Sequence, residues 1–322
     1  MKVLITGGTG FIGAELARTL VSKGEDVILF DIAPNYVRID DIDDKVKVVQ
    51  GNLAYEAEVF NVVKDNNIKG IYHLGGMLSV PSNANPWAAF QINVVGTMNV
   101  LEAARLFGPV KVVFSSSLTT YGLATPPVIT DDTIQRPTTM YGCCKLYCEL
   151  LGRFYHSRFG LDFRSVRYPA VIGPGVRTPG IAQYNAWMIE YPALGKPFEC
   201  FVSEDTKFPV LYFKDAAKSV DVLFHASKDQ VKTMNYNVCG VTASLTAKEL
   251  ELAVKKYIPE AQISYRPDPA IMDFHRSLGL EAFDDSRARE EWGWQPTYSD
   301  FDKIVLDTIN ELKLHPGRYG IA

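Results

Sequence analysis

Tyr141 and Lys145 stand four residues apart in the stretch TTMYGCCK, residues 138–145, so on a helix their side chains share one face. A phenol with an ordinary pKa of about 10 is a poor base at neutral pH. A neighbouring ammonium group stabilises the phenolate and lowers this pKa toward the working range. The pair therefore predicts a tyrosine that takes a proton from a substrate hydroxyl, with a lysine as its electrostatic partner.

Ser115, Ser116 and Ser117 stand at the end of VKVVFSSS, a run that predicts a strand. In doubly wound sheets, ligands bind outside the carboxyl ends of the strands, where these hydroxyls would lie. One of the three serines is therefore predicted to hold a substrate oxygen. Serines after a strand more often form a turn, and many helices contain Tyr-x-x-x-Lys, so the prediction depends on a cofactor site elsewhere in the chain.

Such a site is predicted near the N-terminus, where the strand KVLIT runs into GGTGFIG and then into an amphipathic helix. Gly7, Gly10 and Gly13 lie at three-residue spacing in this stretch. Residues without a Cβ let the backbone approach a pyrophosphate, and the N–H groups at a helix start favour an anion. We expect a dinucleotide-binding turn here; a plain strand-to-helix turn is the alternative.

Asp31 follows the next strand, DVILF, at the distance of about 20 residues that a dinucleotide fingerprint requires. Its carboxylate would accept hydrogen bonds from the adenosine ribose and repel a 2′-phosphate. The next arginine along the chain is Arg38. The sequence therefore favours NAD over NADP.

Strand-like runs alternate with helical patterns in the first half of the chain, which predicts an α/β fold with a doubly wound parallel (Rossmann) sheet. The runs are KVLIT (2–6), DVILF (26–30), VKVVQ (46–50), GIYHL (70–74) and VKVVFSS (110–116). After about residue 170 the sequence becomes rich in Pro and Gly before helical patterns return. We expect an NAD-binding domain over residues 1–170. Residues 171–322 would form mostly a smaller substrate-binding lobe, with some segments that return to the first domain.

The composition favours a small-molecule partner. The 322 residues are 47% hydrophobic with a net charge of −4, and the charges are interspersed, which excludes a basic patch for nucleic acid or a membrane surface. No apolar run reaches the about 20 residues of a membrane span, and the start MKVLITGG does not resemble a signal peptide. The five cysteines and five histidines have no metal-ligand spacing. We therefore expect a cytoplasmic protein with reduced thiols and no metal site.

Cys144 and Cys148 invite a thiol mechanism as an alternative, because they share a helix face beside Lys145. A nucleophilic cysteine needs a base and a group that orients it. The nearest histidine along the chain is His156, three helical turns further on. Packing is the favoured interpretation of both thiols.

Seven segments match, in order, the landmarks of the extended short-chain dehydrogenases/reductases, which the chain resembles. They are GGTGFIG, the Asp31 strand end, HLGG (73–76), NVVGTMN (93–99), FSSSLTTYG (114–122), YGCCK (141–145) and RYP (167–169). The resemblance implies that Ser117 orients the substrate, Tyr141 is the general base or acid, and Lys145 also binds the nicotinamide ribose. It further implies a nucleotide site lined or supported by Phe11, Ile12, Asn52, Leu53, His73, Leu74, Gly75, Asn93, Ser115, Tyr168 and Pro169.

Within that family the chain is most similar to the short-chain L-threonine 3-dehydrogenases, over nearly its whole length. The segments that carry this likeness are PTTMYG (137–142), ELLGRFYHSRFGLDFRSVRYP (149–169), EDTKFPVLYFKDA (204–216) and DDSRAREEWGW (284–294). The resemblance implies NAD-dependent oxidation of a small β-hydroxy substrate, with L-threonine, oxidised to 2-amino-3-ketobutyrate, as the first candidate. Nucleotide-sugar epimerases usually continue with Arg-Tyr-Phe-Asn, whereas this chain reads RYPAVIGPG, which argues against a UDP-sugar.

The chain departs from those dehydrogenases in the substrate region. Gly180, Ile181, Ala182 and Gln183 stand where the relatives typically carry Gly-Thr-Thr-Asp, so a carboxylate that attracts an ammonium is replaced by a neutral amide. These four residues, with Ser79, complete the predicted substrate-binding set. A non-amino hydroxy acid or hydroxyketone is therefore a second candidate substrate. An epimerase or dehydratase that retains its NAD, or a cofactor-sensing regulator, remains a further alternative.

Two other departures lie near the cofactor. Asn52 replaces the more common aspartate and can still offer a hydrogen bond to the adenine. Gly75 and Gly76 replace alanines and are expected to widen the floor beside the nicotinamide or the substrate. The resemblance also implies a homodimer, in which helices around residues 91–107 and 141–159 pair with a second subunit.

Overall fold

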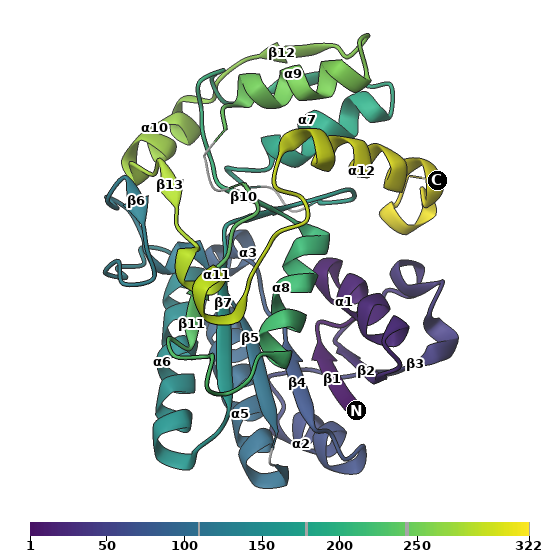
Figure 1. Ribbon diagram of the computed structural model, residues 1–322, viewed down its shortest axis with the longest axis vertical. Helices are drawn as coiled ribbons and strands as arrows, with labels where there is room; N and C mark the ends of the chain where they lie inside the picture. The colour runs from purple at the N-terminus through teal and green to yellow at the C-terminus, as the bar shows by residue number, and fades with distance from the viewer. Residues whose placement is uncertain (109, 178–179, 242–244, 322) are drawn as a thin grey trace.

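A seven-stranded parallel sheet forms the centre of the computed structural model, which describes residues 1–108, 110–177, 180–241 and 245–321 (Figure 1). The strand order is β11-β7-β5-β4-β1-β2-β3, so the order reverses between β1 and β4. The sheet strands are β1 (Lys2–Thr6), β2 (Asp26–Asp31), β3 (Val46–Gln50), β4 (Gly70–His73), β5 (Lys111–Ser117), β7 (Phe163–Tyr168) and β11 (Asn235–Asn237). Ligands of such sheets bind outside the carboxyl ends at the reversal point. The predicted α/β Rossmann class is confirmed.

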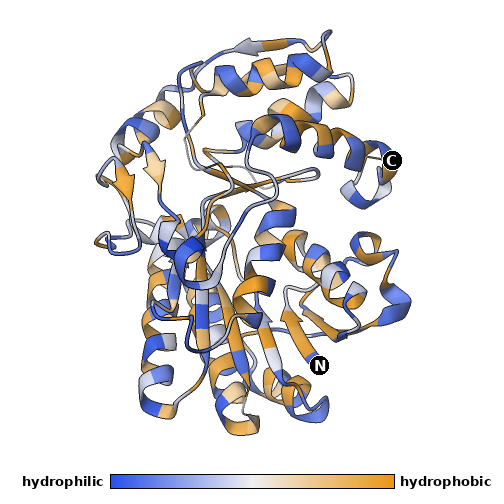
Figure 2. Cartoon of the chain, viewed as in Figure 1, coloured by the Kyte–Doolittle hydropathy of each residue, from blue (hydrophilic) through white to orange (hydrophobic). Residues whose placement is uncertain are grey.

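Alternate residues of the strands supply two apolar cores, one on each face of the sheet, and Figure 2 shows these strands as mostly hydrophobic. In β1, Val3 and Ile5 enter one core and Leu4 enters the other, as the two-residue repeat of a strand requires. Helices α1 (Phe11–Ser22) and α8 (Phe213–His225) supply the first core. Helices α2 (Glu56–Asp65), α5 (Gly96–Phe107) and α6 (Met140–Phe159) supply the second.

Local signals set the ends of the helices that carry the site. Thr139 caps the start of α6 by accepting a hydrogen bond from Gly142 N at 3.1 Å, and Gly160 ends the helix in the left-handed conformation. Gly24 adopts a φ of 77° just after α1. A π-helical stretch, Phe90–Val95, runs directly into α5, where the sequence suggested one continuous helix.

Residues after 170 form most of a second layer, in which α7 (Tyr184–Ala193), α9 (Ala247–Tyr257) and α12 (Phe301–Leu314) share a further core (Figure 1). Its short strands pair as β8 (Ala170–Ile172) with β10 (Val210–Tyr212) and β9 (Phe198–Cys200) with β12 (Ile263–Tyr265). In the same half of the chain, β11, α8, Trp292 and Trp294 belong to the sheet and its core. The domain boundary at residue 170 stays a prediction.

The remaining elements connect these layers. The short strands β6 (Val128–Ile129) and β13 (Ala282–Phe283) pair with each other. The other helices are α3 (Ser79–Ala84), α4 (Pro86–Ala89), α10 (Pro269–Leu278) and α11 (Ser286–Trp292), with 3-10 turns at Tyr36–Ile39, Asp43–Lys45, Leu118–Thr120 and Gly317–Tyr319. Within the described ranges, every helix is too short or too polar to cross a bilayer.

Candidate active site

The glycine-rich turn between β1 and α1 is packed so closely that side chains are excluded from it. Gly7 has a φ of 65°, and a Cβ there would lie 2.8 Å from Gly75 Cα. A Cβ on Gly13 would lie 2.2 Å from Gly7 O. Gly10 precedes α1 without a side-chain cap among the described residues, so the N–H groups of Phe11 and Ile12 are suited to an anion. The turn therefore suits a pyrophosphate, and its role in cofactor binding stays a prediction.

Asp31 ends β2 beside this turn and also holds it in place. Its Oδ2 accepts hydrogen bonds from Thr9 N at 3.1 Å and from Thr9 Oγ1 at 2.8 Å. Its Oδ1 accepts a long hydrogen bond from Ala33 N at 3.3 Å. A carboxylate has about four lone-pair sites, so acceptor capacity remains for the ribose hydroxyls. Arg38 lies over the Phe11 ring, 5.8 Å from its centroid, and donates to Gly175 O.

We predict that Gly13→Ala weakens NAD⁺ binding by about tenfold or more, since the added methyl group forces the turn to open and a hydrogen bond to a charged group is worth about 1.5–3 kcal/mol. The measurement is a calorimetric titration with NAD⁺. Gly317→Ala is the matched control, because a Cβ at that glycine meets nothing within 4 Å. Equal affinity of Gly13→Ala and the parent would contradict the assigned pyrophosphate site.

His73 is buried behind the turn, with both ring nitrogens hydrogen-bonded to threonines. Thr97 Oγ1 donates to Asn93 O at 2.6 Å, so it accepts from His73 Nε2 at 2.9 Å. Thr6 Oγ1 accepts from Gly75 N at 3.1 Å and donates to His73 Nδ1 at 2.7 Å. Burial, with a smaller effect of Lys145, lowers the pKa of His73 to about 3. The ring is therefore neutral and supports the loop of Leu74 and Gly75 from the interior.

Asn93 clamps the same loop from the π-helical stretch. Met77 N donates to Asn93 Oδ1 at 2.7 Å, and Asn93 Nδ2 donates to Met77 O at 3.0 Å. A Cβ on Gly76 would lie 2.9 Å from Asn93 Oδ1 and 3.9 Å from Lys145 Nζ. The expectation that paired glycines widen the floor is therefore wrong at Gly76, because the Asn93 amide and the Lys145 ammonium fill the space.

The structure brings Ser117, Tyr141 and Lys145 together. Thr119 donates twice to Ser117 Oγ, at 3.2 Å from N and 3.0 Å from Oγ1. The Ser117 proton is left for the Tyr141 phenol, which lies close enough for the serine hydroxyl to lower its pKa. Lys145 is buried, its Nζ donates to Ser115 O at 2.6 Å, and it lies over the Tyr141 ring, 5.5 Å from the centroid.

The pKa of Tyr141 differs from the expectation that its neighbours lower it. Burial raises the pKa of Tyr141 above its ordinary value, with a further increase from Cys144, while the Ser117 hydrogen bond lowers it. The Tyr141 side chain is half-buried. Lys145 faces the ring, so protein groups alone do not produce the expected lowering of the phenol pKa. Burial also lowers the pKa of Lys145, to about 8.

Four other predicted cofactor residues have structural positions that the sequence did not show. Tyr168 is buried and its hydroxyl donates to Ala216 O at 2.8 Å, so its side chain lies in the core, and Pro169 follows between β7 and β8. Asn52 Oδ1 accepts from Ala54 N at 3.0 Å. Leu53 is buried, and its Cδ1 lies 3.0 Å from the position of a Cβ on Gly75. Leu53 thus packs against Gly75 in the loop after β4, while Asn52 bonds to its own loop.

The predicted substrate segment, residues 180–183, leads into α7. Ala182 is buried in an apolar cluster that also contains Leu118, the residue after Ser117, and Ile181 packs against that cluster. Ile181 O accepts a hydrogen bond from His275 Nε2 at 3.1 Å, a contact that the sequence did not indicate. Gly180 O accepts from Gln183 N at 3.2 Å. The segment and Ser117 therefore adjoin one apolar cluster, whereas Ser79 begins α3, which packs beside α6.

The cysteines near Lys145 pack in the core. Cys144 and Cys148 are buried, and their thiols contact Ala89 O at 3.9 Å and Asn93 O at 3.3 Å. Burial raises the pKa of both thiols, that of Cys148 to about 12, so neither is a thiolate at neutral pH. The packing interpretation is confirmed.

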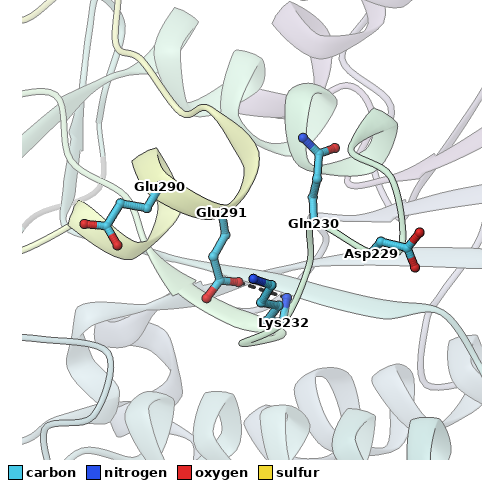
Figure 3. A pocket seen from close by; sticks show the side chains of 5 residues that line it. All are labelled: Asp229, Gln230, Lys232, Glu290 and Glu291. Atoms are coloured by element: carbon cyan, nitrogen blue, oxygen red, sulfur yellow. Dashed lines mark hydrogen bonds between the residues drawn. The ribbon is translucent and has the colours of Figure 1, made fainter.

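A surface hollow between the loop after α8 and α11 contains none of the predicted site residues (Figure 3). Glu291 accepts from the backbone N of Lys232 at 2.9 Å and of Thr233 at 3.1 Å, which gives it a structural role. Glu290 and Asp229 point outward on opposite sides of the hollow in Figure 3. Across the described part of the chain, His, Cys, Asp and Glu side chains form no group of three or more that is suited to a metal ion.

Comparison with known proteins gives consistent matches. A family model described as the NAD dependent epimerase/dehydratase family matches residues 3–239. A mitochondrial L-threonine 3-dehydrogenase of Bos taurus is 33% identical over 315 residues, which cover 96% of this chain and 82% of that protein. An uncharacterized epimerase/dehydratase of Staphylococcus aureus is 32% identical over 324 residues, which cover 96% of this chain and 97% of that protein. The holo form of a GalE-like L-threonine dehydrogenase from Cupriavidus necator superposes with a TM-score of 0.88 at 31% identity, over 97% of this chain and 100% of that chain.

Proposed function

The chain belongs to the NAD-dependent epimerase/dehydratase family and is an NAD-dependent dehydrogenase, and we propose that it oxidises a small β-hydroxy compound, with L-threonine as the first candidate. The observation that carries the proposal is the Lys145 ammonium, which is anchored at Ser115 O and lies over the Tyr141 ring, with the Ser117 hydroxyl beside the phenol. A hydroxyl placed between Ser117 and Tyr141 would meet a hydrogen-bond donor and a proton acceptor together.

In the proposed mechanism, Tyr141 takes the proton of the substrate hydroxyl at its phenol oxygen. Ser117 donates its proton to the substrate oxygen and so orients it, while Thr119 holds the serine in the donor orientation. NAD⁺, when bound, supplies the hydride acceptor and a positive ring. Lys145, anchored at Ser115 O, binds the nicotinamide ribose and stabilises the phenolate. The glycine-rich turn and Asp31 hold the other half of the dinucleotide.

A non-amino hydroxy acid or hydroxyketone is the second candidate substrate. The replacement at residues 180–183 supports it, because Ala182 is buried among apolar side chains and Gln183 carries an amide where a carboxylate would attract an ammonium. The named relatives support L-threonine, since two of them carry that substrate in their names at 31–33% identity.

The test is a screen for NADH formation with L-threonine, 3-hydroxybutyrate and 4-hydroxypentan-2-one, which present an amino acid, its deaminated analogue and a β-hydroxyketone. The substrate is the compound with the highest kcat/KM. Stoichiometric release of NADH distinguishes a dehydrogenase from an epimerase that returns its hydride. Absence of NADH with every small β-hydroxy compound in the screen would contradict the proposed substrate class.

We also propose a homodimer formed through α5 and α6. Tyr147, Leu150 and Phe154 follow one another on α6 at helical spacing and are exposed, as are Met98 and Leu106 on α5. Burial of this apolar surface against a second copy would stabilise a two-fold pair of helices.

Leu150→Glu should therefore convert the dimer into a monomer, because a carboxylate buried at the interface lacks a partner. Light scattering after gel filtration measures the mass. Leu252→Glu on α9 is the matched control, since Leu252 is 58% exposed and Leu150 is 57% exposed. A parent protein that is monomeric at micromolar concentration would contradict the proposed interface.

The cytoplasm is the proposed compartment, supported by five cysteines that are all free thiols. The bovine relative is named as mitochondrial, which makes a second reducing compartment the alternative. Fluorescence microscopy of the tagged full-length protein in its own cell decides between the two.

A further inference from the structure

Glu149 lies one helical turn beyond Lys145 on α6 and is only 1% exposed. Its carboxylate accepts from Arg167 Nε at 2.9 Å and Nη2 at 2.7 Å, and from Gln135 Nε2 at 3.2 Å. The Ser116 hydroxyl also donates to it. Arg167 belongs to β7 and Ser116 to β5. One carboxylate therefore joins the helix of the active site to the ends of two neighbouring strands.

Ser116, the β5 residue that donates to Glu149, has an active-site residue on each side of it along the chain. The Ser115 carbonyl, before it, accepts a hydrogen bond from the Lys145 ammonium, and the Ser117 hydroxyl, after it, lies beside the Tyr141 phenol. Peptide units are planar and rigid, so a displacement of Ser116 moves both neighbours. The contact between Ser116 and Glu149 therefore ties this end of β5, which carries Ser117, to the helix that carries Tyr141.

We propose that Glu149 is a positioning residue of this dehydrogenase, which holds the end of β5 against α6 and places a negative charge one turn from Lys145. The inference rests on the proposed function, because it assigns Glu149 a task in that same site. It acts through Ser116 and Lys145 and touches neither substrate nor cofactor.

The groups around Lys145 support the proposal that Glu149 supplies the negative charge beside this lysine. Burial lowers the pKa of Lys145 to about 8, and Cys148, Cys144 and Glu149 oppose this effect. Both thiols have raised pKa values and are uncharged at neutral pH. Of the three residues, Glu149 is thus the one that carries a negative charge, since it forms an ion pair with Arg167.

Other titratable groups face this cluster from neighbouring elements. Tyr121 OH accepts from Arg167 Nη1 at 2.8 Å, and burial raises the pKa of this phenol. His73 on β4 is neutral, because burial lowers its pKa to about 3. Tyr141 precedes Lys145 on α6 and has a raised pKa. On the far side of Arg167, Asp131 lies at 4.0 Å, and burial raises its pKa to about 6. Loss of the Glu149 charge would leave the Arg167 cation partly uncompensated, which further disfavours a protonated Lys145.

The test compares Glu149→Gln with the parent by ¹³C NMR of protein labelled at the lysine ε-carbons, with the Lys145 signal assigned from its absence in Lys145→Met. Glutamine keeps the shape and an oxygen that accepts from Ser116, but it removes the charge. We expect the Lys145 titration midpoint to fall by about one pH unit. The measurement needs no substrate.

Ser116→Ala separates the positioning role of Glu149 from the effect of its charge. The substitution keeps every ionised group and removes the hydrogen bond between the strand and Glu149. We expect a Lys145 titration midpoint close to that of the parent, because no charge is removed, and a kcat about tenfold lower, since a small misplacement of reacting groups is costly. Glu251→Gln is the matched control, as Glu251 is a 3% exposed carboxylate on α9 paired with Lys248 and Lys255. It should change neither the Lys145 titration nor kcat.

A parent-like Lys145 titration in Glu149→Gln overturns the charge assignment, and a parent-like kcat in Ser116→Ala overturns the positioning role. If Glu149→Gln does not fold, Glu149→Gln with Arg167→Met removes both buried charges and takes its place. An unchanged Lys145 midpoint in that double variant also overturns the charge assignment. A parent that oxidises none of the screened compounds contradicts the proposed function instead, and the NMR titration still decides the inference.

Discussion

Tyr141→Phe should lower kcat by about 10²- to 10⁴-fold, the usual contribution of general acid–base catalysis, while the Kd for NAD⁺ stays within about threefold of the parent. The substitution removes one oxygen and keeps the ring that lies beneath the Lys145 ammonium. The proton of the substrate hydroxyl then lacks its acceptor. The measurement is steady-state NADH formation with the best compound of the substrate screen, together with a calorimetric titration of NAD⁺.

Tyr257→Phe on α9 is the control for loss of a phenol hydroxyl outside the site. It should leave kcat unchanged. Turnover of Tyr141→Phe within a factor of about 10 of the parent would show that Tyr141 is not the general base. The roles proposed for Ser117 and Lys145 would then fail as well, because both residues are proposed to act together with Tyr141.

Lys145→Met should lower kcat/KM for NAD⁺ by about 10²-fold, because a hydrogen bond from an ionised donor and the charge that stabilises the phenolate are lost together. The pH dependence gives a second signature. Burial lowers the pKa of Lys145 to about 8, so in the parent kcat/KM for NAD⁺ should fall above about pH 8, where the ammonium loses its proton. That alkaline limb should be absent in Lys145→Met.

Lys111→Met is a closely matched control, since Lys111 lies at the other end of β5. Its Nζ donates to Phe224 O at 2.6 Å and lies 4.8 Å from the Phe224 ring centroid. Burial likewise lowers its pKa. This variant should retain the affinity for NAD⁺ and the alkaline limb. An unchanged pH profile in Lys145→Met would show that another group titrates.

The strand β7 was not predicted from the hydropathy pattern of the sequence. Its sequence, FRSVRY, contains two arginines, and the sequence analysis did not identify it as a sheet strand, although it is fully buried. Arg164 pairs with Asp162 at 2.8 Å and donates to Leu223 O at 2.6 Å, and Arg167 pairs with Glu149. Buried charges are tolerated where partners neutralise them. Asp162 directly precedes the strand, but Glu149 and the Leu223 carbonyl come from helices elsewhere in the chain, so hydropathy along the strand does not reveal them.

By itself the sequence determined the features that depend on neighbours along the chain. The turn of Gly7, Gly10 and Gly13 and the four-residue spacing of Tyr141 and Lys145 follow from local geometry, because a strand, a turn and a helix each repeat over a few residues. These features predicted the Rossmann class, and they identified the residues to which the site is assigned.

Tertiary structure alone decided how those residues are oriented and charged. It directs the Lys145 ammonium to Ser115 O, fills the space above Gly76 with the Asn93 amide, and joins Glu149 to Ser116. Burial, which depends on the packing of the whole chain, sets the titration of Tyr141 and Lys145. A sequence shows which donors and acceptors exist, but segments far apart along the chain must fold together before each group has a partner.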